Sequence, residues 1–139
     1  MVDYITDFGS NPFIVDINRA AMYNDTFRTA LWTGNHLQLT LMNIRAGEDI
    51  GLEVHTDDDQ LLIIVDGQGL VEMGDTEDNL YFLQLIFDGS AIFIPAGTWH
   101  NITNTGNTPI KLYSIYAPPA HPWGTVHETK EIAEAEENH

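Results

Sequence analysis

Three side chains that commonly bind metals or move protons lie close together in residues 53–60. Glu53 and His55 are two positions apart, and Gln60 follows a run of three aspartates. In an extended chain, residues i and i+2 point to the same face, so Glu53 and His55 would project together. Carboxylate and imidazole bind divalent transition metals, and the amide oxygen of Gln60 would add a weaker donor. The stretch therefore predicts part of a metal site inside a β-barrel.

A second functional spacing lies in residues 89–104. It reads G-x5-P-x-G-x2-H-x3-N and comprises Gly89, Pro95, Gly97, His100 and Asn104. A Pro–Gly turn redirects the chain and would bring His100 over the first group. Two histidines with one carboxylate are typical of non-haem Fe(II) sites and also suit Mn, Co, Ni or Zn. We expect one divalent transition metal (Mn, Fe, Ni, Co or Zn) bound by Glu53, His55, Gln60 and His100.

These two stretches resemble the paired motifs of the cupin superfamily. Every specified position of the second motif is matched. The first motif, G-x5-H-x-H-x4-E-x6-G, is matched at Gly47, His55 and Gly67. Glu53 and Gln60 stand at the two positions that differ. The resemblance covers residues 37–117 and implies a jelly-roll barrel, or double-stranded β-helix, similar to bacterial single-domain cupins labelled mannose-6-phosphate isomerase-like.

The candidate catalytic residues are Glu53 and Tyr116. Glu53 can be a metal ligand, or a general base beside a metal that has three other ligands. Tyr113 and Tyr116 are an odd number of positions apart on the last predicted strand, so they face opposite sides and one phenol enters the barrel. Three residues that follow could fold over the opening as a lid or pack at an edge: His121, Trp123 and His127.

Eight or nine short strands, separated by Gly, Pro and Asn turns, must position these residues, and they predict an all-β fold. Strands are expected at 27–32, 36–44, 52–55, 60–65, 69–73, 81–87, 91–95, within 101–109 and at 110–117. Leucine alternates with other residues in 36–44, which predicts a half-buried strand. Asp66-Gly67 predicts a hairpin turn, and the aspartates at 57–59 predict a solvated loop.

The length of 139 residues fits one domain. We expect an N-terminal extension at 1–25, a cupin β-barrel at 26–120 and an acidic tail at 121–139. Residues 127–139 are acidic and rich in alanine, which predicts a short, peripheral C-terminal helix.

Charge excludes several classes of partner. The chain has five Lys+Arg against 21 Asp+Glu, a net charge of −16. Nucleic acids and anionic membranes need a basic surface, so neither is expected as a partner. The basic residues that could bind an anion are Arg19, Arg28, Arg45, Lys111 and Lys130. They are not clustered in the sequence, which argues against a phosphosugar. The start of the chain lacks a secretory pattern, so a cytoplasmic location is expected.

Three functions fit these observations. The first is a metal-dependent isomerase, epimerase or lyase that acts on a sugar-like or hydroxycarbonyl compound. The second is a non-haem Fe(II) dioxygenase, and the third is a non-catalytic module that binds a polar metabolite or is purely structural. The runs 61–65 and 91–94 are apolar on both faces, so their outer faces need cover and a homodimer is expected.

Overall fold

The computed structural model describes residues 6–137, which form nine strands and two helices. In chain order the elements are α1 (Ile17–Tyr23), β1 (Arg28–Thr33), β2 (Gln38–Ile44), β3 (Asp59–Asp66), β4 (Gly69–Gly74), β5 (Phe82–Ile86), β6 (Ala91–Ile94), β7 (Trp99–Asn104), β8 (Ile110–Ala117), β9 (Val126–His127) and α2 (Lys130–Glu137). No helix among these residues has the length and apolar character needed to cross a membrane.

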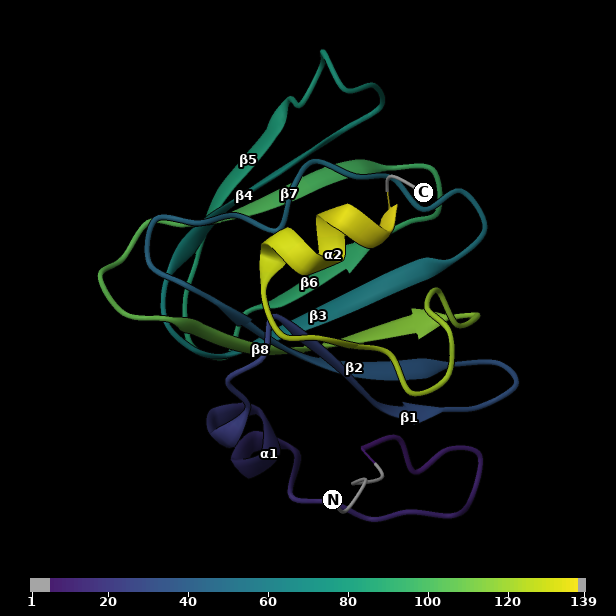
Figure 1. The fold of residues 1–139 in the computed structure, drawn as a ribbon. Helices are drawn as coiled ribbons and strands as arrows, with labels where there is room; N and C mark the ends of the chain where they lie inside the picture. Colours follow the sequence, from purple (N-terminus) through teal and green to yellow (C-terminus); the bar gives the residue numbers. More distant parts are fainter. Residues whose placement is uncertain (1–5, 138–139) are drawn as a thin grey trace.

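Two antiparallel sheets enclose the interior. The larger sheet has the order β6-β3-β8-β2-β1-β9, and the smaller has the order β5-β4-β7. Figure 1 shows the smaller sheet above the larger one. The predicted all-β fold and the short C-terminal helix are confirmed. The hairpin predicted at Asp66-Gly67 is wrong, because β3 and β4 belong to different sheets and this turn carries the chain from one to the other.

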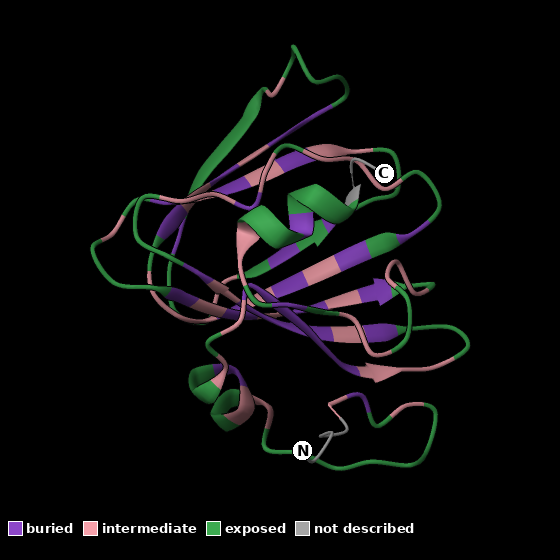
Figure 2. Cartoon of the chain, viewed as in Figure 1, coloured by how far each residue is buried: buried purple, intermediate pink, exposed green. Residues whose placement is uncertain are grey.

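The interior has an apolar part and a polar part. The apolar part is built mainly from alternate residues of the strands and includes Met42, Ile44, Leu62, Ile64, Val71, Ile102, Ile110 and Leu112. Figure 2 shows this alternation of buried and half-buried residues along β3. The polar part lies on the inner face of the larger sheet, where Gln38 of β2 and Gln60 of β3 both pair with Tyr116 of β8. All three side chains are buried.

Strand β2 directs its leucines outward. Leu39 and Leu41 pack with residues of α1 on the outside of the barrel. Gln38 and Thr40 face the interior and are fully buried. The predicted alternation is therefore present, with polar residues on the inner face of this strand.

The C-terminal segment packs against the barrel. Strand β9 pairs with β1, and Ala133 of α2 is buried in the main core. Nζ of Lys130 at the start of α2 donates to the Asp49 carboxylate. The other described side chains of α2 are mostly exposed (Figure 2). The division of the chain at residues 25 and 120 stays a prediction.

Candidate metal centre

Backbone pairing places Glu53 opposite His100. Glu53 N donates to His100 O at 3.0 Å, and His100 N donates to Glu53 O at 2.9 Å. The turn before β7 holds the next residue of the group, because Gly97 N donates to His55 O at 2.8 Å. Gly97 has φ +85°, a conformation that favours glycine. The two sequence stretches are thus joined by three main-chain hydrogen bonds, as the Pro–Gly turn predicted.

The side chains of Glu53, His55 and His100 converge. Oε1 of Glu53 lies 3.4 Å from Nε2 of His55 and 3.3 Å from Nε2 of His100. The three ligating atoms all lie within 4.8 Å of one another. Donors bound at 2.0–2.2 Å to one ion are about 3–3.5 Å apart. The cluster is therefore compatible with a divalent metal.

The orientation of His100 supports this fit. Its Nδ1 lies 3.0 Å from Thr98 O, and a carbonyl oxygen only accepts, so Nδ1 carries the proton. Nε2 then presents a lone pair toward the Glu53 carboxylate and has no hydrogen-bond partner among the described residues, although it is fully buried. Two electron-rich atoms that face each other without a proton between them suit a cation. A backbone carbonyl that fixes the ring in this way is common around metal-binding histidines.

His55 has an acidic neighbour on its other side. Its Nδ1 lies 3.8 Å from Oδ2 of Asp58. Asp58 is buried, so the solvated loop predicted for the three aspartates is wrong at this position. Burial would lower the pKa of His55, but the Glu53 and Asp58 carboxylates outweigh it and raise that pKa.

The charge state of Glu53 also suits a ligand. Burial alone would raise the pKa of its carboxyl group, and the His100 and His55 imidazoles lower that pKa only when a ring N–H faces the carboxylate. With Nε2 of His100 unprotonated, a cation is needed in its place. The Glu53 and His55 side chains are about one-fifth exposed (20% and 19%), whereas His100 is enclosed. The anionic ligand therefore lies where solvent reaches the edge of the cluster.

Gln60 and Tyr116 face the same interior from the larger sheet. Nε2 of Gln60 donates to Oγ of Ser114 at 2.9 Å, which leaves its carbonyl oxygen buried and without a described partner. The Tyr116 ring lies edge-on to His55, with 5.5 Å between ring centroids. Its hydroxyl is buried and makes no hydrogen bond within residues 6–137. Tyr113 packs outside the barrel with the α1 residues, so the opposite orientation of the two tyrosines is confirmed.

The predicted lid residues divide into two groups. His121 lies edge-on to Tyr116 at 5.2 Å between centroids, and His127 is buried 6.3 Å from His121. Trp123 is exposed, and its Nε1 donates to Gly9 O, away from the cluster. The Gln38 amide accepts from Ala120 N and His121 N and donates to His121 O. This buried amide fixes the segment beside the site.

The interior position of Arg28 was not predicted. Arg28 of β1 is only 2% exposed, and its Nη1 lies 3.1 Å from Nδ1 of His127. Its charge acts on Tyr116 and on His121, as their pKa shifts show after the larger effect of burial. The sequence contained one signal, a charged residue inside the otherwise uncharged strand 27–32.

Comparison with known proteins gives one family model and several similar proteins. The family model described as Cupin domain matches residues 40–116. The chain is 61% identical over 134 residues to the uncharacterized protein YrkC of Bacillus subtilis, covering 96% of this chain and 72% of that one. The crystal structure of BH2720 from Bacillus halodurans shares 62% identity with a TM-score of 0.93, covering 94% of this chain and 99% of that one.

A more distant structure has the same fold. A cupin from Methanocaldococcus jannaschii described as rmlc-like, with a double-stranded β-helix, shares 18% identity and a TM-score of 0.58, covering 69% of this chain and 84% of that one. At this identity the likeness concerns the fold alone, and it agrees with the predicted jelly-roll barrel. The match of the family model over residues 40–116, more than half of the chain, shows that the chain belongs to the cupin family.

Proposed function

We propose that the chain is a metal-dependent enzyme whose metal is held by Glu53, His55, His100 and Gln60. The observation that carries this proposal is the buried Nε2 of His100, which faces Glu53 without a hydrogen-bond partner among the described residues. Two imidazoles, one carboxylate and one amide oxygen suit Mn, Fe, Co, Ni or Zn. Oε1 of Glu53 lies within 3.4 Å of a ring nitrogen of both histidines, so the ligand role is favoured over the general-base role.

The reaction we propose is isomerisation, epimerisation or lyase chemistry on a sugar-like or hydroxycarbonyl compound. A bound divalent metal would polarise a carbonyl oxygen of such a compound. Tyr116 supplies the proton-transfer group, because its buried hydroxyl has no described partner and lies beside His55. Burial raises the pKa of this phenol, so it stays protonated at neutral pH and would donate to the carbonyl oxygen of the substrate. Solvent at the exposed edge of the cluster, beside Glu53 and His55, would take up the proton released from the adjacent carbon.

Hydrogen exchange tests this reaction directly. Metal-stripped protein, reloaded separately with Mn, Fe, Co, Ni and Zn, is incubated in deuterated water with small aldoses, ketoses and hydroxyketo acids. We expect metal-dependent deuterium incorporation next to the carbonyl, without oxygen, measured by mass spectrometry. Tyr116→Phe should slow it by about 10²–10⁴-fold, the usual contribution of general acid–base catalysis. Tyr113→Phe, outside the barrel, is the matched control and should keep the native rate.

Two other outcomes would replace this proposal. The same two-histidine, one-carboxylate set supports Fe(II) oxygen chemistry, so oxygen consumption that requires iron, without exchange, would indicate a dioxygenase. Saturable binding of a test compound without any turnover would indicate a metabolite-binding module. Turnover of phosphorylated sugars alone would instead narrow the proposal to the mannose-6-phosphate isomerase-like function.

The cytoplasmic location stays a prediction, whichever of these functions is found.

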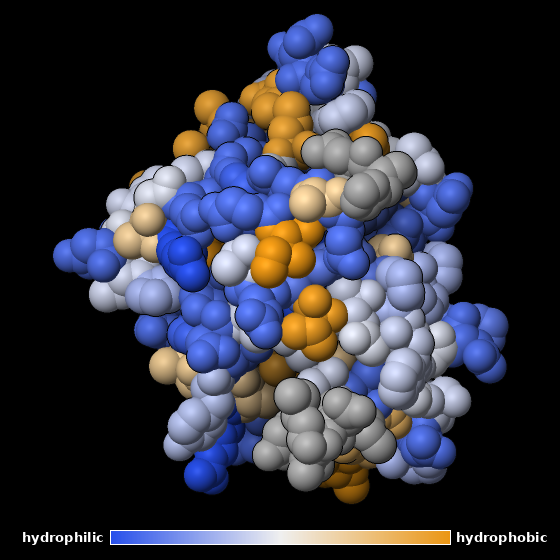
Figure 3. Space-filling model, in the orientation of Figure 1, coloured by the Kyte–Doolittle hydropathy of each residue, from blue (hydrophilic) through white to orange (hydrophobic). Residues whose placement is uncertain are grey.

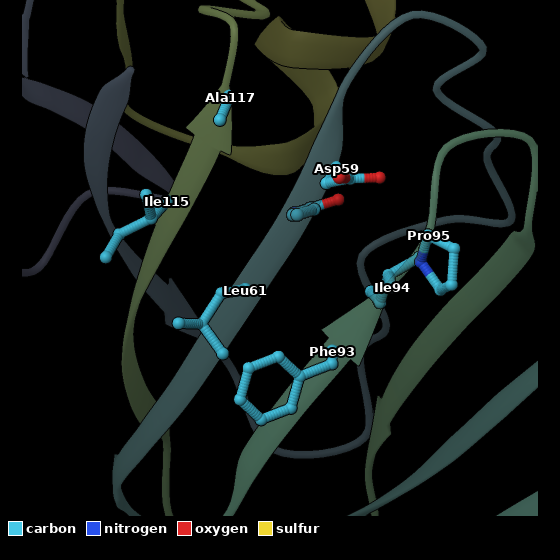
Figure 4. A pocket seen from close by; sticks show the side chains of 8 residues that line it. Asp59, Leu61, Phe93, Ile94, Pro95, Ile115 and Ala117 are labelled. Carbon is cyan, nitrogen blue, oxygen red and sulfur yellow. The ribbon is translucent and has the colours of Figure 1, made fainter. Parts of the chain in front are cut away.

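We also propose that the chain forms a homodimer through an apolar outer surface on β3, β5, β6 and β8. Leu61 and Phe93 are paired on neighbouring strands and, with Ile115, line a pocket of about 300 Å³ (Figure 4). Phe93 is 70% exposed, and Leu83 of the edge strand β5 is 60% exposed. Figure 3 shows apolar side chains gathered near the top of the molecule, where β5 lies in Figure 1. A second copy would cover these side chains.

Light scattering at micromolar concentration tests the dimer. The native chain should have twice the mass of one 15.6 kDa chain. Phe93→Glu should shift it to one chain, because a buried unpaired carboxylate is costly. Leu37→Glu, which changes an exposed leucine on the β1–β2 connection, should remain dimeric. A native mass of one chain would contradict the dimer.

A further inference from the structure

Arg28 is a buried cation without an acidic partner. Within residues 6–137 it makes no ion pair with any Asp or Glu, and its Nε has no hydrogen-bond partner. The chain carries 21 acidic residues against five Lys+Arg, so a carboxylate could readily have been placed beside it. A buried guanidinium that lacks an anion is energetically costly unless a ligand supplies one.

The guanidinium lies beside the residues around the candidate metal centre. After burial, the charge of Arg28 is the largest cause that holds the pKa of His121 at about 3. A series of rings in edge-on or tilted contact runs from His127, beside Arg28, to His100 in the candidate metal centre. In order they are His127, His121, Tyr116, His55 and His100.

Several buried polar atoms between Arg28 and the candidate metal centre also lack hydrogen-bond partners among the described residues. Buried polar groups in proteins nearly always have hydrogen-bond partners, so a group of exceptions needs an explanation. Five of the nine buried side-chain atoms without a partner in the described part of the chain are Arg28 Nε, Thr40 Oγ1, Gln60 Oε1, Tyr116 Oη and His121 Nε2. They come from β1, β2, β3, β8 and the segment after β8. A polar ligand inside the barrel would satisfy them together.

We propose that Arg28 binds a carboxylate group of the substrate. The substrate is then a hydroxycarbonyl acid or a hydroxy acid, with its hydroxyl or carbonyl oxygen at the metal centre. This proposal rests on the proposed function and adds the substrate class. A guanidinium binds a carboxylate through two parallel hydrogen bonds, and Arg28 presents an unpaired Nε for one of them. A single cation neutralises one negative charge, which favours a carboxylate over a phosphate dianion.

A structural role for Arg28 is the competing explanation. Nδ1 of His127 is 3.1 Å from Arg28, and the other ring nitrogen of His127 pairs with the Glu136 carboxylate. This chain of contacts ties β1 to the C-terminal segment. The Glu136 side chain, which contacts His127, is more than half exposed (63%). Glu136 therefore balances the charge of Arg28 only weakly. The two explanations differ in what Arg28→Met would change.

Calorimetric titration separates these explanations. The ligands are glycolate, 3-hydroxypropionate and 4-hydroxybutyrate, each compared with its neutral amide, on metal-free and metal-loaded protein. We expect Arg28→Met to weaken binding of at least one of the three carboxylates by 10-fold or more in both forms. A hydrogen bond to a charged group contributes about 1.5–3 kcal/mol, and 1.4 kcal/mol is tenfold. The amides should bind equally to native and variant protein. Arg45→Met, at an exposed arginine, is the matched control.

The outcomes that would overturn the proposal are distinct. Equal carboxylate affinity in native and Arg28→Met protein, with a lower unfolding midpoint for the variant, would assign Arg28 to structure alone. Tighter binding of inorganic phosphate than of any carboxylate would overturn the carboxylate assignment. If Arg28→Met does not fold, Arg28→Lys keeps the charge without the planar fork, and it should still weaken carboxylate binding measurably. Metal content measured on the same samples shows separately whether the metal proposal fails.

Discussion

His100→Ala is expected to abolish tight metal binding. Native protein, reloaded and then dialysed, should retain about one equivalent of a transition metal by mass spectrometry. Changes to residues that only orient a ligand cost 10–100-fold in metal affinity, so removal of the buried imidazole should cost more than about 100-fold. Glu53→Ala should show a similar loss, because its Oε1 lies between the two imidazole nitrogens at 3.3 and 3.4 Å.

Matched variants distinguish this result from a general effect of mutation. His36 and Glu77 are exposed and lie outside the cluster, so His36→Ala and Glu77→Ala should retain the full equivalent. Metal lost from His100→Ala but kept by Glu53→Ala would make Glu53 a base in place of a ligand. Native protein that takes up none of Mn, Fe, Co, Ni or Zn would contradict the metal centre.

Metal binding is expected to raise the unfolding midpoint of the native protein by on the order of 10 °C. The proposed ligands come from the segment before β3, from β3 itself and from β7, so one ion would link the two sheets. A ligand at 1,000 times its dissociation constant stabilises the folded state by about 4 kcal/mol. For a chain of this length, 1 kcal/mol corresponds to a few degrees. Differential scanning calorimetry with and without Zn or Mn measures the shift.

The shift should depend on the ligands and on the type of metal. A chelator should reverse it, and His100→Ala should show almost none. Mg²⁺ prefers six oxygen ligands, so at equal concentration it should stabilise far less than Zn²⁺. Equal stabilisation of native protein and His100→Ala would mean that the metal acts elsewhere, for example at the acidic surface.

The convergence of Glu53, His55 and His100 could be predicted because it depends on local spacing. Two residues at i and i+2 share a face, and a Pro–Gly turn brings the next strand alongside. The main-chain pair between Glu53 and His100 and the hydrogen bond from Gly97 to His55 agree with this expectation. Such features need only a few consecutive residues, so a single sequence contains them.

The direction in which a strand presents its residues could not be predicted from alternation alone. In β2, apolar and polar residues alternate, yet Gln38 and Thr40 face the interior while Leu39 and Leu41 pack against α1. Helix α1 covers the outside of the sheet, so both faces of β2 are buried. The usual assignment of leucine to the inner face therefore fails here.

Long-range pairing explains the residues that were missed. Arg28 lies beside His127 because β9 returns to pair with β1, a contact between residues 99 positions apart. The Asp66-Gly67 turn resembles a hairpin locally, but the partner strands of β3 are β6 and β8. Each of these outcomes depends on the jelly-roll topology, which local turn signals do not specify.

Anomalous diffraction from crystals of zinc-loaded protein tests the proposed metal centre most directly. The expected result is one strong zinc peak inside the barrel, about 2.0–2.2 Å from Glu53, His55 and His100, with the Gln60 carbonyl oxygen turned toward it. A peak only at the protein surface, for example at the aspartates 57–59, or an interior peak that none of these four residues contacts, would contradict the proposed metal centre.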